Sequence, residues 1–539
     1  MGIKTEMSKV AQYLNEHILG EVISTESIRK RFAHDGSVLA ITPELVIYPR
    51  VTNDIRKVAR FSWQLAEKGH VLPLTIRGGG TDQTGASIGK GIIIDTTAHL
   101  NKILHIALKD RDRFVHVQPG VRFKNLNDTL QSHGLTIPTH SDNDINETIG
   151  GAVANNSTGY LSGKYGTTGE YVTRLELILA NGDIIETGRI SRRDLDHKKG
   201  LQTFEGEIYR KIDGLIDDNE QLIKDSIGDT TKDNTGYPGI AKVKQRDGSF
   251  DLTPLIIGSQ GTLGIMSEIV IKTEFFSGNE SVIVAVFESS EAARDAADLV
   301  VSDQPSVLEF IDGELFNQAR ARGKTYPFFA SGTPVSIGAV LYISFNDFSD
   351  GARKRKVKHV LKKISKPEVN IITSEEHSLD ELHAIREVSK TASIPTTKAE
   401  SLPQIIDGAS IPVDRREEFF SSITELAAKH HVSLPVHIGW LDGIVHTRPA
   451  LDLHKVSDKQ KVFKLINDYA ELVTKLGGNM SANTSEGRLR AAASYTQLDE
   501  DVLNLYSEIR VAFDPFGTLN PGVKQKSDLK TLAAALSSD

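Results

Sequence analysis

The sequence predicts an α+β protein with more than one domain. From residue 41 to about 273, short apolar runs are separated by glycines and alternate with helical stretches such as residues 52–68, a texture typical of α+β domains. From about residue 281, longer apolar runs alternate with amphipathic helices, which predicts an antiparallel sheet with helices on one face. At 539 residues the chain is too long for a single hydrophobic core.

Domain boundaries are expected where this texture changes. Near the start, apolar residues recur at helical spacing at Val10, Tyr13, Leu14 and Ile18, which predicts a helix docked on the surface. The polar stretch FFSGNES, at about 275–281, is the best candidate for a linker. The expected organisation is therefore a helical extension at 1–40, a glycine-rich domain at 41–275, a second domain at 276–505 and a C-terminal segment at 506–539.

A hairpin is predicted at Asn181-Gly182, which lies between two strand-like runs, TRLELILA and DIIETG. This dipeptide favours a type I′ turn, because asparagine and glycine both tolerate the positive φ that such a turn needs at its two central positions. The register of the two strands is then fixed locally.

Composition excludes several functions. The chain has 63 Lys and Arg against 71 Asp and Glu, a net charge of −8 that disfavours nucleic acid as a partner. Cysteine is absent, which excludes disulfides, thiolate metal ligands and a cysteine nucleophile. No stretch approaches the roughly 20 apolar residues of a membrane span, so we expect a cytoplasmic protein with at most peripheral membrane contact. The basic run at 354–366 is expected to be a solvated helix face.

Glycine-rich segments carry the chemical signal. The first, RGGGTDQTG at 77–85, follows a strand-like run, and its three consecutive glycines allow backbone N–H groups to converge on an anion. It is neither G-x-G-x-x-G nor a P-loop, which disfavours a Rossmann NAD site or a nucleoside triphosphatase. Similar runs follow at 148–166, 257–265 and 513–522. Four such segments are hard to explain as unrelated turns, so we expect them to converge on one bound cofactor.

The four segments resemble those of FAD-linked oxidoreductases of the vanillyl-alcohol oxidase and p-cresol methylhydroxylase type. The resemblance covers about residues 41–524 and is strongest to the branch of D-lactate dehydrogenase and the glycolate oxidase large subunit. It implies an FAD-binding domain of two α+β subdomains at 41–275, a substrate or cap domain at 276–505, and a C-terminal segment that returns to the flavin.

The same resemblance implies which residues hold FAD. Relatives with a histidyl flavin link carry histidine at the position of Thr81 or its neighbour, so FAD is expected to be noncovalent. The first segment would bind the pyrophosphate, and the later segments would line the ribityl chain and flavin. The implied residues are Gly78, Gly79, Gly80, Thr81, Asp82, Gly85, Thr148, Gly150, Gly151, Asn155, Gly159, Gly261, Gly264, Ile265 and Asn520.

In the hydroxy-acid branch, two histidines and a glutamate bind a divalent metal, and a further histidine takes the substrate's hydroxyl proton. The first motif, His-x-Gly-Asp-Gly-Asn-x-His, is matched by His437 to His446, with two extra residues between the histidines. At the second motif, Gly-Glu-His-Gly, an ungapped alignment places Asn483 and Thr484 where glutamate and histidine are expected. A gapped alignment offers Glu486 as the acid instead.

These departures leave the roles of the histidines open. His437, His446 and Glu486 would suit zinc, manganese or iron if they met at one point. Alternatively, the histidines act as a catalytic base or as substrate contacts. The third interpretation is two strand-end histidines, one of them hydrogen-bonded within the sheet.

Five further residues lie in segments that resemble family active-site segments. Arg386 resembles the arginine that grips a substrate carboxylate, although an exposed helix charge explains it equally well. Tyr237, in the loop that also holds Asn234, would either hydrogen-bond substrate or pack in the interior. Glu309 and Asp312 are explained as well by hydrogen bonding at the edge of the core.

The expected function is transfer of a hydride from a small 2-hydroxy acid, such as D-lactate or glycolate, to FAD. Electrons would pass on to a quinone, a flavoprotein or another acceptor. Two alternatives stay open: an FAD-dependent oxidoreductase of a sugar or other alcohol without the metal site, and a flavin-binding subunit of a redox complex with no turnover of its own.

Overall fold

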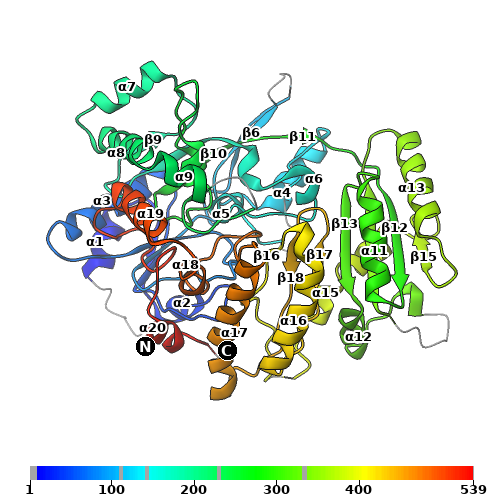
Figure 1. The fold of residues 1–539 in the computed structure, drawn as a ribbon. Coiled ribbons are helices and arrows are strands. Elements are labelled where there is room, and N and C mark those ends of the chain that lie inside the picture. The colour runs from blue at the N-terminus through cyan, green and yellow to red at the C-terminus, as the bar shows by residue number, and fades with distance from the viewer. Residues whose placement is uncertain are drawn as a thin grey trace, which may run out of the picture. The chain divides into compact units, whose positions relative to one another are not determined.

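The computed structural model describes residues 9–108, 113–139, 145–227, 232–329, 337–397 and 399–537 (Figure 1). Contacts divide the chain into two compact units. The first unit comprises Met1–Gly159, Thr167–Glu274 and Ser481–Asp539, and the second comprises Tyr160–Gly166 and Phe275–Met480. The chain therefore passes into the second unit twice, once briefly and once for most of its second half.

A four-stranded sheet carries the first glycine segment in the first unit. Three of its strands are parallel and one is antiparallel. Its central strand is buried along its whole length, as expected for a parallel strand covered on both faces. The helix α3 (Thr52–Ala66) connects β2 to β3 along the chain. The order is β1 (Glu21–Ile23), β2 (Leu45–Tyr48), β4 (Ile92–Asp95) and β3 (Leu74–Arg77).

The N-terminal segment contributes more than the expected helix. The predicted docked helix is confirmed as α1 (Lys9–His17), because Leu14 and Ile18 are buried in the core of the four-stranded sheet. Residues 1–8 lie outside the described residues. The strand β1 was not expected, since three residues are too few to show a periodic pattern. It pairs antiparallel with β2 and extends the sheet.

A second, five-stranded sheet in the first unit is antiparallel throughout. The predicted hairpin joins two of its strands, but the type I′ turn is wrong, because only Gly182 has a positive φ, at +84°. The Gly182 N–H donates to the Leu179 carbonyl at 2.9 Å, the pattern of a longer hairpin loop in which one glycine takes the left-handed position. The order is β5 (Ile103–Ala107), β6 (Phe114–Val117), β10 (Ile265–Lys272), β8 (Val172–Ile178) and β9 (Ile184–Glu186).

The C-terminal segment joins the first unit beside β3. The Leu74 N–H donates to the Thr518 carbonyl, and the Asn520 N–H donates to the Leu74 carbonyl, both at 2.8 Å. The other elements of this unit are α2 (Glu26–Arg31), α4 (Phe123–Gln131), β7 (Leu135–Thr136), α5 (Ile149–Asn155), α7 (Arg192–Gly200), α8 (Phe204–Asp218), α9 (Glu220–Ser226), α10 (Thr253–Ile256), α18 (Ala491–Tyr495), α19 (Glu500–Phe513) and α20 (Leu529–Ala534).

The second unit is built on a seven-stranded sheet whose neighbouring strands are all antiparallel, as predicted. The expectation of helices on one face only is wrong. The helices α11 (Ser290–Val301) and α13 (Asp350–Ile364) cover one face, and α12 (Gly313–Ala321), α14 (Leu379–Arg386) and α15 (Val388–Ala392) cover the other. The order is β15 (Asn370–Thr373), β12 (Ser281–Phe287), β14 (Ala339–Phe345), β13 (Val307–Asp312), β17 (His437–Gly439), β18 (Ile444–His446) and β16 (Ala409–Ser410).

The sequence carries a sign of this double cover. The strands β12 and β14 are continuous apolar runs, and every residue of β14 is buried. Continuous runs indicate burial on both faces, whereas a one-sided sheet alternates apolar and polar residues. The remaining elements of the unit are α6 (Ser162–Tyr165), β11 (Glu274–Phe275, which begins one residue before the unit boundary), α16 (Arg416–His430) and α17 (Val456–Lys475).

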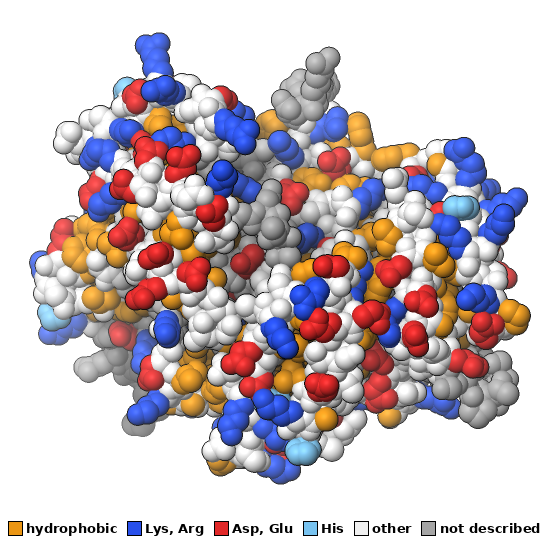
Figure 2. All heavy atoms as spheres, in the orientation of Figure 1, with side chains coloured by type: hydrophobic (Ala, Val, Ile, Leu, Met, Phe, Trp, Pro, Cys, Tyr) orange, Lys and Arg blue, Asp and Glu red, His pale blue; other side chains and the backbone are white. Residues whose placement is uncertain are grey.

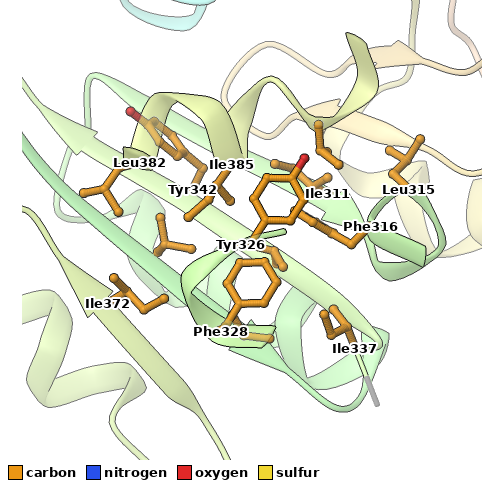
Figure 3. Packing of buried hydrophobic residues seen from close by; sticks show 14 of the residues in the cluster. Ile311, Leu315, Phe316, Tyr326, Phe328, Ile337, Tyr342, Ile372, Leu382 and Ile385 are labelled. Atoms are coloured by element: carbon orange, nitrogen blue, oxygen red, sulfur yellow. The ribbon is translucent and has the colours of Figure 1, made fainter. Parts of the chain in front are cut away.

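An apolar cluster fixes α12, α14 and α15 to the sheet (Figure 3). Its aromatic centre is Phe316, whose ring meets those of Tyr326 and Phe328 edge to face at 5.3 and 5.4 Å. Leu382 and Ile385 of α14 point into the same cluster. The polar residues at the ends of α14 and α15 are therefore held on a packed base.

The basic run at 354–366 falls largely on α13, as predicted for a solvated helix face. Val360 and Ile364 are buried, whereas Lys354, Lys358 and Lys362 are exposed. Figure 2 shows Lys and Arg side chains gathered over this helix. Within the part of the chain that the structure describes, no helix is long and apolar enough to cross a membrane.

Candidate cofactor cleft and active-site residues

A cleft in the first unit is lined by three of the four glycine segments. It holds about 770 Å³ of empty space, part of it open to solvent, within the range of cofactor and ligand sites. Its further walls include Ile76, Pro119, Glu147, Gln260 and Met266. The residues implied for FAD that line it are Gly78, Gly79, Gly80, Thr81, Asp82, Thr148, Gly150, Gly151, Asn155, Gly261, Gly264 and Ile265.

The first segment presents unused backbone donors to this cleft. Among the described residues, the N–H groups of Gly78 to Thr81 have no hydrogen-bond acceptor. Side chains are excluded here, because a Cβ on Gly79 would lie 2.0 Å from the Asn146 carbonyl oxygen. A Cβ on Gly78 would lie 2.2 Å from Thr148 Oγ1. Consecutive unpaired amides on a side-chain-free loop are the arrangement that binds a diphosphate, so the residues present fit FAD.

A chain of amide hydrogen bonds ties the segments together. Asn155 Nδ2 donates to Asp82 Oδ1 at 3.2 Å, and Gln260 Nε2 donates to Asn155 Oδ1 at 2.9 Å. The Asp82 carboxylate also accepts the N–H groups of Thr84 and Ala86, at 3.0 and 2.7 Å. Asp82 thus closes its own loop and connects it to the second and third segments.

Asn520 extends this chain to the C-terminal segment from behind the cleft wall. Its Nδ2 donates to the carbonyls of Ala86 and Gln260 at 2.8 Å, and its Oδ1 accepts from Thr75 Oγ1 and Arg488 at 3.1 Å. Asn520 is buried and does not line the cleft. All four segments are therefore joined within one hydrogen-bonded network.

Two other implied residues also lie outside the lining. Gly85 has a φ of +77° and faces Leu39, so it is a turn residue of the first loop. Gly159 ends the first-unit segment immediately before Tyr160. Their expected contact with FAD stays a prediction.

A cleft residue that sequence reasoning missed is Gln260. It adopts a left-handed φ of +52°, lines the cleft, and accepts the Gly487 N–H at 3.0 Å through Oε1. Its only sequence signal is its place between Gly258 and Gly261. A turn does not need a long polar side chain, so a glutamine inside a glycine run is expected to make a hydrogen bond elsewhere in the fold.

Buried charge lies behind the first loop. The Arg77 guanidinium occupies the space that a Cβ on Gly80 would need, at 2.2 Å. Burial and, to a lesser extent, the nearby Asp82 carboxylate raise the pKa of Asp35 to about 6. Arg77 faces both of these carboxylates as well as Asp95, which offsets the charge they bring to the loop.

In the second unit, the two predicted histidines are direct cross-strand partners. His437 of β17 lies opposite His446 of β18, with ring centroids 6.1 Å apart. The two extra residues between them are absorbed by the hairpin loop. Trp440 in that loop is buried against Phe310, and its Nε1 donates to Asp298 at 2.8 Å.

Both ring nitrogens of His437 are engaged. Its Nε2 lies 3.1 Å from Glu309 Oε2, and its Nδ1 lies 3.2 Å from Ser389 Oγ. Arg386 Nε donates to the same Glu309 carboxylate at 3.1 Å, and its guanidinium lies over the Tyr160 ring at 4.2 Å. Burial alone would raise the pKa of Glu309, but Arg386 and His437 lower it to about 2. Arg386 is only 11% exposed, so its interpretation as an exposed helix charge is wrong.

His446 is held differently. Its Nδ1 lies 2.9 Å from Asp407 Oδ1, and its side chain is 36% exposed. No partner for Nε2 is seen among the described residues. Burial lowers the pKa of His446, but the Asp407 carboxylate outweighs this and the net shift is upward. An oriented imidazole with one accessible nitrogen is the arrangement of a general base.

Glu486 is not available as a metal ligand. It lies in the first unit, where its Oε2 accepts from Lys524 Nζ at 2.7 Å in a fully buried ion pair. Its Oε1 accepts the Gly236 N–H at 2.9 Å and the Tyr495 hydroxyl at 3.0 Å. Because Glu486 is fully paired in this way, the predicted set of three donors does not fit a metal. Over the ranges described, no group of three or more His, Asp and Glu side chains is placed to bind one.

Other residues proposed from the sequence also form hydrogen bonds within the protein. Asn483, at the expected glutamate position, accepts from the Thr158 N–H and hydroxyl. The Tyr237 hydroxyl is buried 2.7 Å from Thr262 Oγ1, which favours packing over contact with substrate. Asn234 is buried and donates to the Ser481 carbonyl at 3.0 Å. Asp312 accepts the Glu314 N–H and caps α12.

Comparisons with known families cover most of the chain. The family described as FAD binding domain matches residues 43–188, and the family described as FAD linked oxidases, C-terminal domain, matches residues 278–523. The first match contains the loop Gly78–Asp82 and α5. The second contains both histidines of the second unit and ends after Asn520.

Curated relatives are similar over nearly the whole chain. D-2-hydroxyglutarate dehydrogenase of Pantoea ananatis is 25% identical over 93% of this chain and 50% of its own length. Glycolate oxidase subunit GlcD of Bacillus subtilis is 26% identical over 92% of this chain and 91% of its own length. The chain thus spans about half the length of the D-2-hydroxyglutarate dehydrogenases that it matches.

Solved structures share the fold. The 4-ethylphenol oxidase of Gulosibacter chungangensis superposes with a TM-score of 0.67 at 14% identity, covering 98% of this chain and 99% of that one. p-Cresol methylhydroxylase superposes with a TM-score of 0.67 at 15% identity, covering 97% of both chains. The predicted architecture of a two-subdomain FAD-binding domain with an α+β second domain is confirmed.

Proposed function

Because this chain belongs to the FAD-linked oxidases of the vanillyl-alcohol oxidase and p-cresol methylhydroxylase type, we propose that it oxidises the CH–OH group of a small 2-hydroxy acid. The observation that carries the proposal is the Asp407–His446 pair, which leaves one imidazole nitrogen accessible. The names of the D-2-hydroxyglutarate dehydrogenase and glycolate oxidase relatives support a hydroxy acid as the substrate class.

The cofactor cleft has the residues that this reaction needs. The amides of Gly78 to Thr81 would hold the FAD diphosphate, and the Asp82, Asn155 and Gln260 chain would keep the glycine segments in place. When bound, FAD supplies the acceptor for the substrate's hydride. Because the cradle consists of backbone amides and Thr81 stands where relatives carry a linked histidine, FAD is expected to be held noncovalently.

His446 is the proposed base. The carboxylate of Asp407 requires a proton on Nδ1, which leaves the lone pair of Nε2 to accept the hydroxyl proton of the substrate. Asp407 then faces the imidazolium that forms, and stabilises it. Asp407 acts through His446 and is a positioning residue, in the manner of the acid in a Ser-His-Asp triad.

His437 is a poorer candidate for the base. Its Nε2 lies 3.1 Å from Oε2 of the buried Glu309, so this nitrogen is not open to substrate. Its Nδ1 faces the Ser389 hydroxyl. We propose that His437 packs beside His446 and fixes the direction of its ring, without exchanging a proton.

A second substrate class is favoured by one observation. Asn483 and Thr484 stand where the hydroxy-acid branch carries glutamate and histidine, and Asn483 hydrogen-bonds the Thr158 hydroxyl. Neutral residues at these two positions also suit a sugar or another alcohol as substrate. Such substrates belong in the same screen.

The test is anaerobic mixing of flavin-loaded protein with a panel of D- and L-2-hydroxy acids, sugars and simple alcohols, while flavin absorbance is recorded. We expect bleaching by a hydroxy acid, and slow bleaching in His446→Asn. His197→Asn, an exposed histidine on α7, is the matched control and should behave as the wild type. Bleaching by no compound of the panel would overturn the proposal and favour a flavin-binding subunit without its own turnover.

A further inference from the structure

We infer that Arg448, with Ser393, forms the subsite that binds the carboxylate of the substrate, in place of the expected Arg386. This inference rests on the proposed oxidation of a 2-hydroxy acid. The observation that carries it is the position of the Arg448 guanidinium beside the Asp407–His446 pair.

Arg448 lies on the same side of the chain as the proposed base. His446 ends β18, Thr447 is buried on the opposite side, and Arg448 again faces the side of His446. This alternation follows from extended backbone, in which residues two apart share a face. The Asp407 carboxylate lies 2.9 Å from the imidazole and 3.7 Å from the guanidinium, so it holds the two groups together.

Ser393 fixes the other end of the guanidinium. Its Oγ accepts from Arg448 NH1 at 3.0 Å, and its hydroxyl donates to the Ser389 carbonyl at 2.6 Å. Ser389 lies in the first turn of α15 and Ser393 follows its last residue, so both stand on the packed base described above. The guanidinium is thereby oriented before substrate arrives, which lowers the entropic cost of binding a carboxylate.

The two arginines of this cluster differ in how their charge is used. Arg386 is 11% exposed and is paired with Glu309, which is itself buried. Turning Arg386 toward a substrate carboxylate would leave Glu309 as a buried charge with a weaker partner, which is costly. Arg448 is 27% exposed and shares Asp407 with His446. A second carboxylate can therefore approach Arg448 without breaking a buried ion pair.

Charge balance during the reaction points the same way. The hydroxyl proton moves to Nε2 of His446, and the hydride on the same carbon leaves with its electron pair to FAD, giving a 2-oxo acid. After this step Asp407 faces two cations, the imidazolium of His446 and the guanidinium of Arg448, while Asp442 makes a smaller contribution at the imidazole. A substrate carboxylate on Arg448 adds a further negative charge, so the substrate helps to offset the positive charge that the base gains.

The experiment compares lactate with lactamide, which has the same hydroxyl but no charge. In anaerobic flavin reduction, we expect the wild type to prefer the productive enantiomer of lactate over its amide by about 100-fold. Arg448→Gln should raise the KM for lactate by about 10- to 100-fold and leave reduction by lactamide within about threefold, since one charged hydrogen-bond pair is lost. Arg448→Lys should lie between the two, because it keeps the charge and loses the planar fork.

Arg355→Gln on α13, which is exposed in the second unit, is the matched control and should leave both substrates unchanged. Bound flavin reports that each variant is folded. An unchanged KM for lactate in Arg448→Gln, or an equal loss for lactate and lactamide, would overturn the subsite.

A binding measurement separates this inference from the proposed reaction. Oxalate carries the carboxylate but no oxidisable carbon, and it should raise the melting temperature of the wild type but not that of Arg448→Gln. If no hydroxy acid reduces the wild-type flavin, the proposed function fails, while a Tm shift by oxalate that depends on Arg448 still supports the anion subsite. A Tm shift that persists in Arg448→Gln overturns the subsite whatever the substrate screen shows.

Discussion

The cofactor cleft of the first unit and the polar cluster of the second unit are built from different materials. The diphosphate cradle of the cleft is formed by backbone, where the described residues offer no acceptor to the four amides from Gly78 to Thr81. The cluster is formed by charged side chains, such as Glu309, Asp407 and His446, that come from distant strands and loops. The cleft therefore binds its ligand through backbone amides that no side chain covers, whereas the properties of the cluster depend on which charged side chains pair with one another.

This difference determines how each region tolerates change. A side chain added at Gly79 has nowhere to go, because the nearest atom is the backbone carbonyl oxygen of Asn146, 2.0 Å away. In the cluster, exchange of one charged residue leaves its partner behind, so the effect depends on which nitrogen or oxygen was engaged. Substitutions in the two regions should therefore separate cofactor binding from chemistry.

The largest effect is expected in the cleft, from Gly79→Val. Its Cβ would lie 2.0 Å from the Asn146 carbonyl oxygen, so the loop must move and the amide cradle is lost. We expect purified protein without flavin and an FAD affinity lowered at least about 100-fold, measured by fluorescence titration. Gly214→Ala on α8, where a Cβ meets no atom within 4 Å, is the control and should retain flavin. Full flavin content in Gly79→Val would mean that the cradle is not the FAD site.

In the cluster, Asp407→Asn and His446→Gln should each slow flavin reduction by about 10²- to 10⁴-fold with flavin content unchanged, the usual loss for a general base. The double variant should be no slower than His446→Gln alone, because Asp407 acts only through the imidazole. Stopped-flow absorbance measures all three rates. Multiplicative losses in the double variant would show that Asp407 contributes independently of His446.

Gln260→Ala should produce a smaller loss, in cofactor affinity and not in the rate of reduction. Its side chain donates to Asn155 and accepts from Gly487, so truncation leaves buried polar groups unpaired at about 1–3 kcal/mol. That range corresponds to a 5- to 150-fold weaker FAD affinity. Gln497→Ala, in a turn outside the cleft, is the control. A slower reduction rate at saturating FAD would place Gln260 in the chemistry instead.

How far the sequence could predict each region follows from the same contrast. Glycine runs indicate a cofactor cleft, because the lack of side chains that the cleft requires can be recognised directly in the sequence. Twelve residues inferred from those runs line the cleft, since local backbone conformation decides their role. The sequence predicts Asn520 at the edge of the flavin, whereas the structure places it behind the wall of the cleft. This position depends on hydrogen bonds to Ala86 and Gln260, which are far away in the sequence and cannot be recognised from a local pattern.

In the cluster, the residue types were recognised but their pairings were not. His437 and His446 were expected together, and the sheet register makes them neighbours. Glu309 and Asp407 decide what each imidazole can do, and both lie far from the histidines in sequence. The sequence offers Glu486 as a metal ligand, because no local pattern shows that it pairs with Lys524, which is 38 residues away. Which charged residues pair depends on how the chain folds, and a local sequence pattern does not contain this information.

The pH dependence of reduction tests whether His446 works as a neutral base. Asp407 raises the pKa of His446 above its usual value of 6.5 despite burial, Asp442 adds to this, and Arg448 opposes it. The reduction rate should therefore fall about tenfold per pH unit below a pKa higher than 6.5, because protonated Nε2 accepts no proton. Asp407→Asn should move this limb to lower pH. A limb that stays in place in Asp407→Asn would assign the titration to another group.

Chelation is expected to have the smallest effect of all. Neither His437, whose two nitrogens face Glu309 and Ser389, nor Glu486, which is paired with Lys524, has a donor to offer a metal. Dialysis against EDTA should therefore change the rate of flavin reduction by less than about twofold, and added zinc or manganese should not raise it. A loss of tenfold or more that is restored by one of these metals would require His437 to exchange Glu309 for the metal. The contrast between the two regions would then change, because the cluster, like the cleft, would be organised around a bound group.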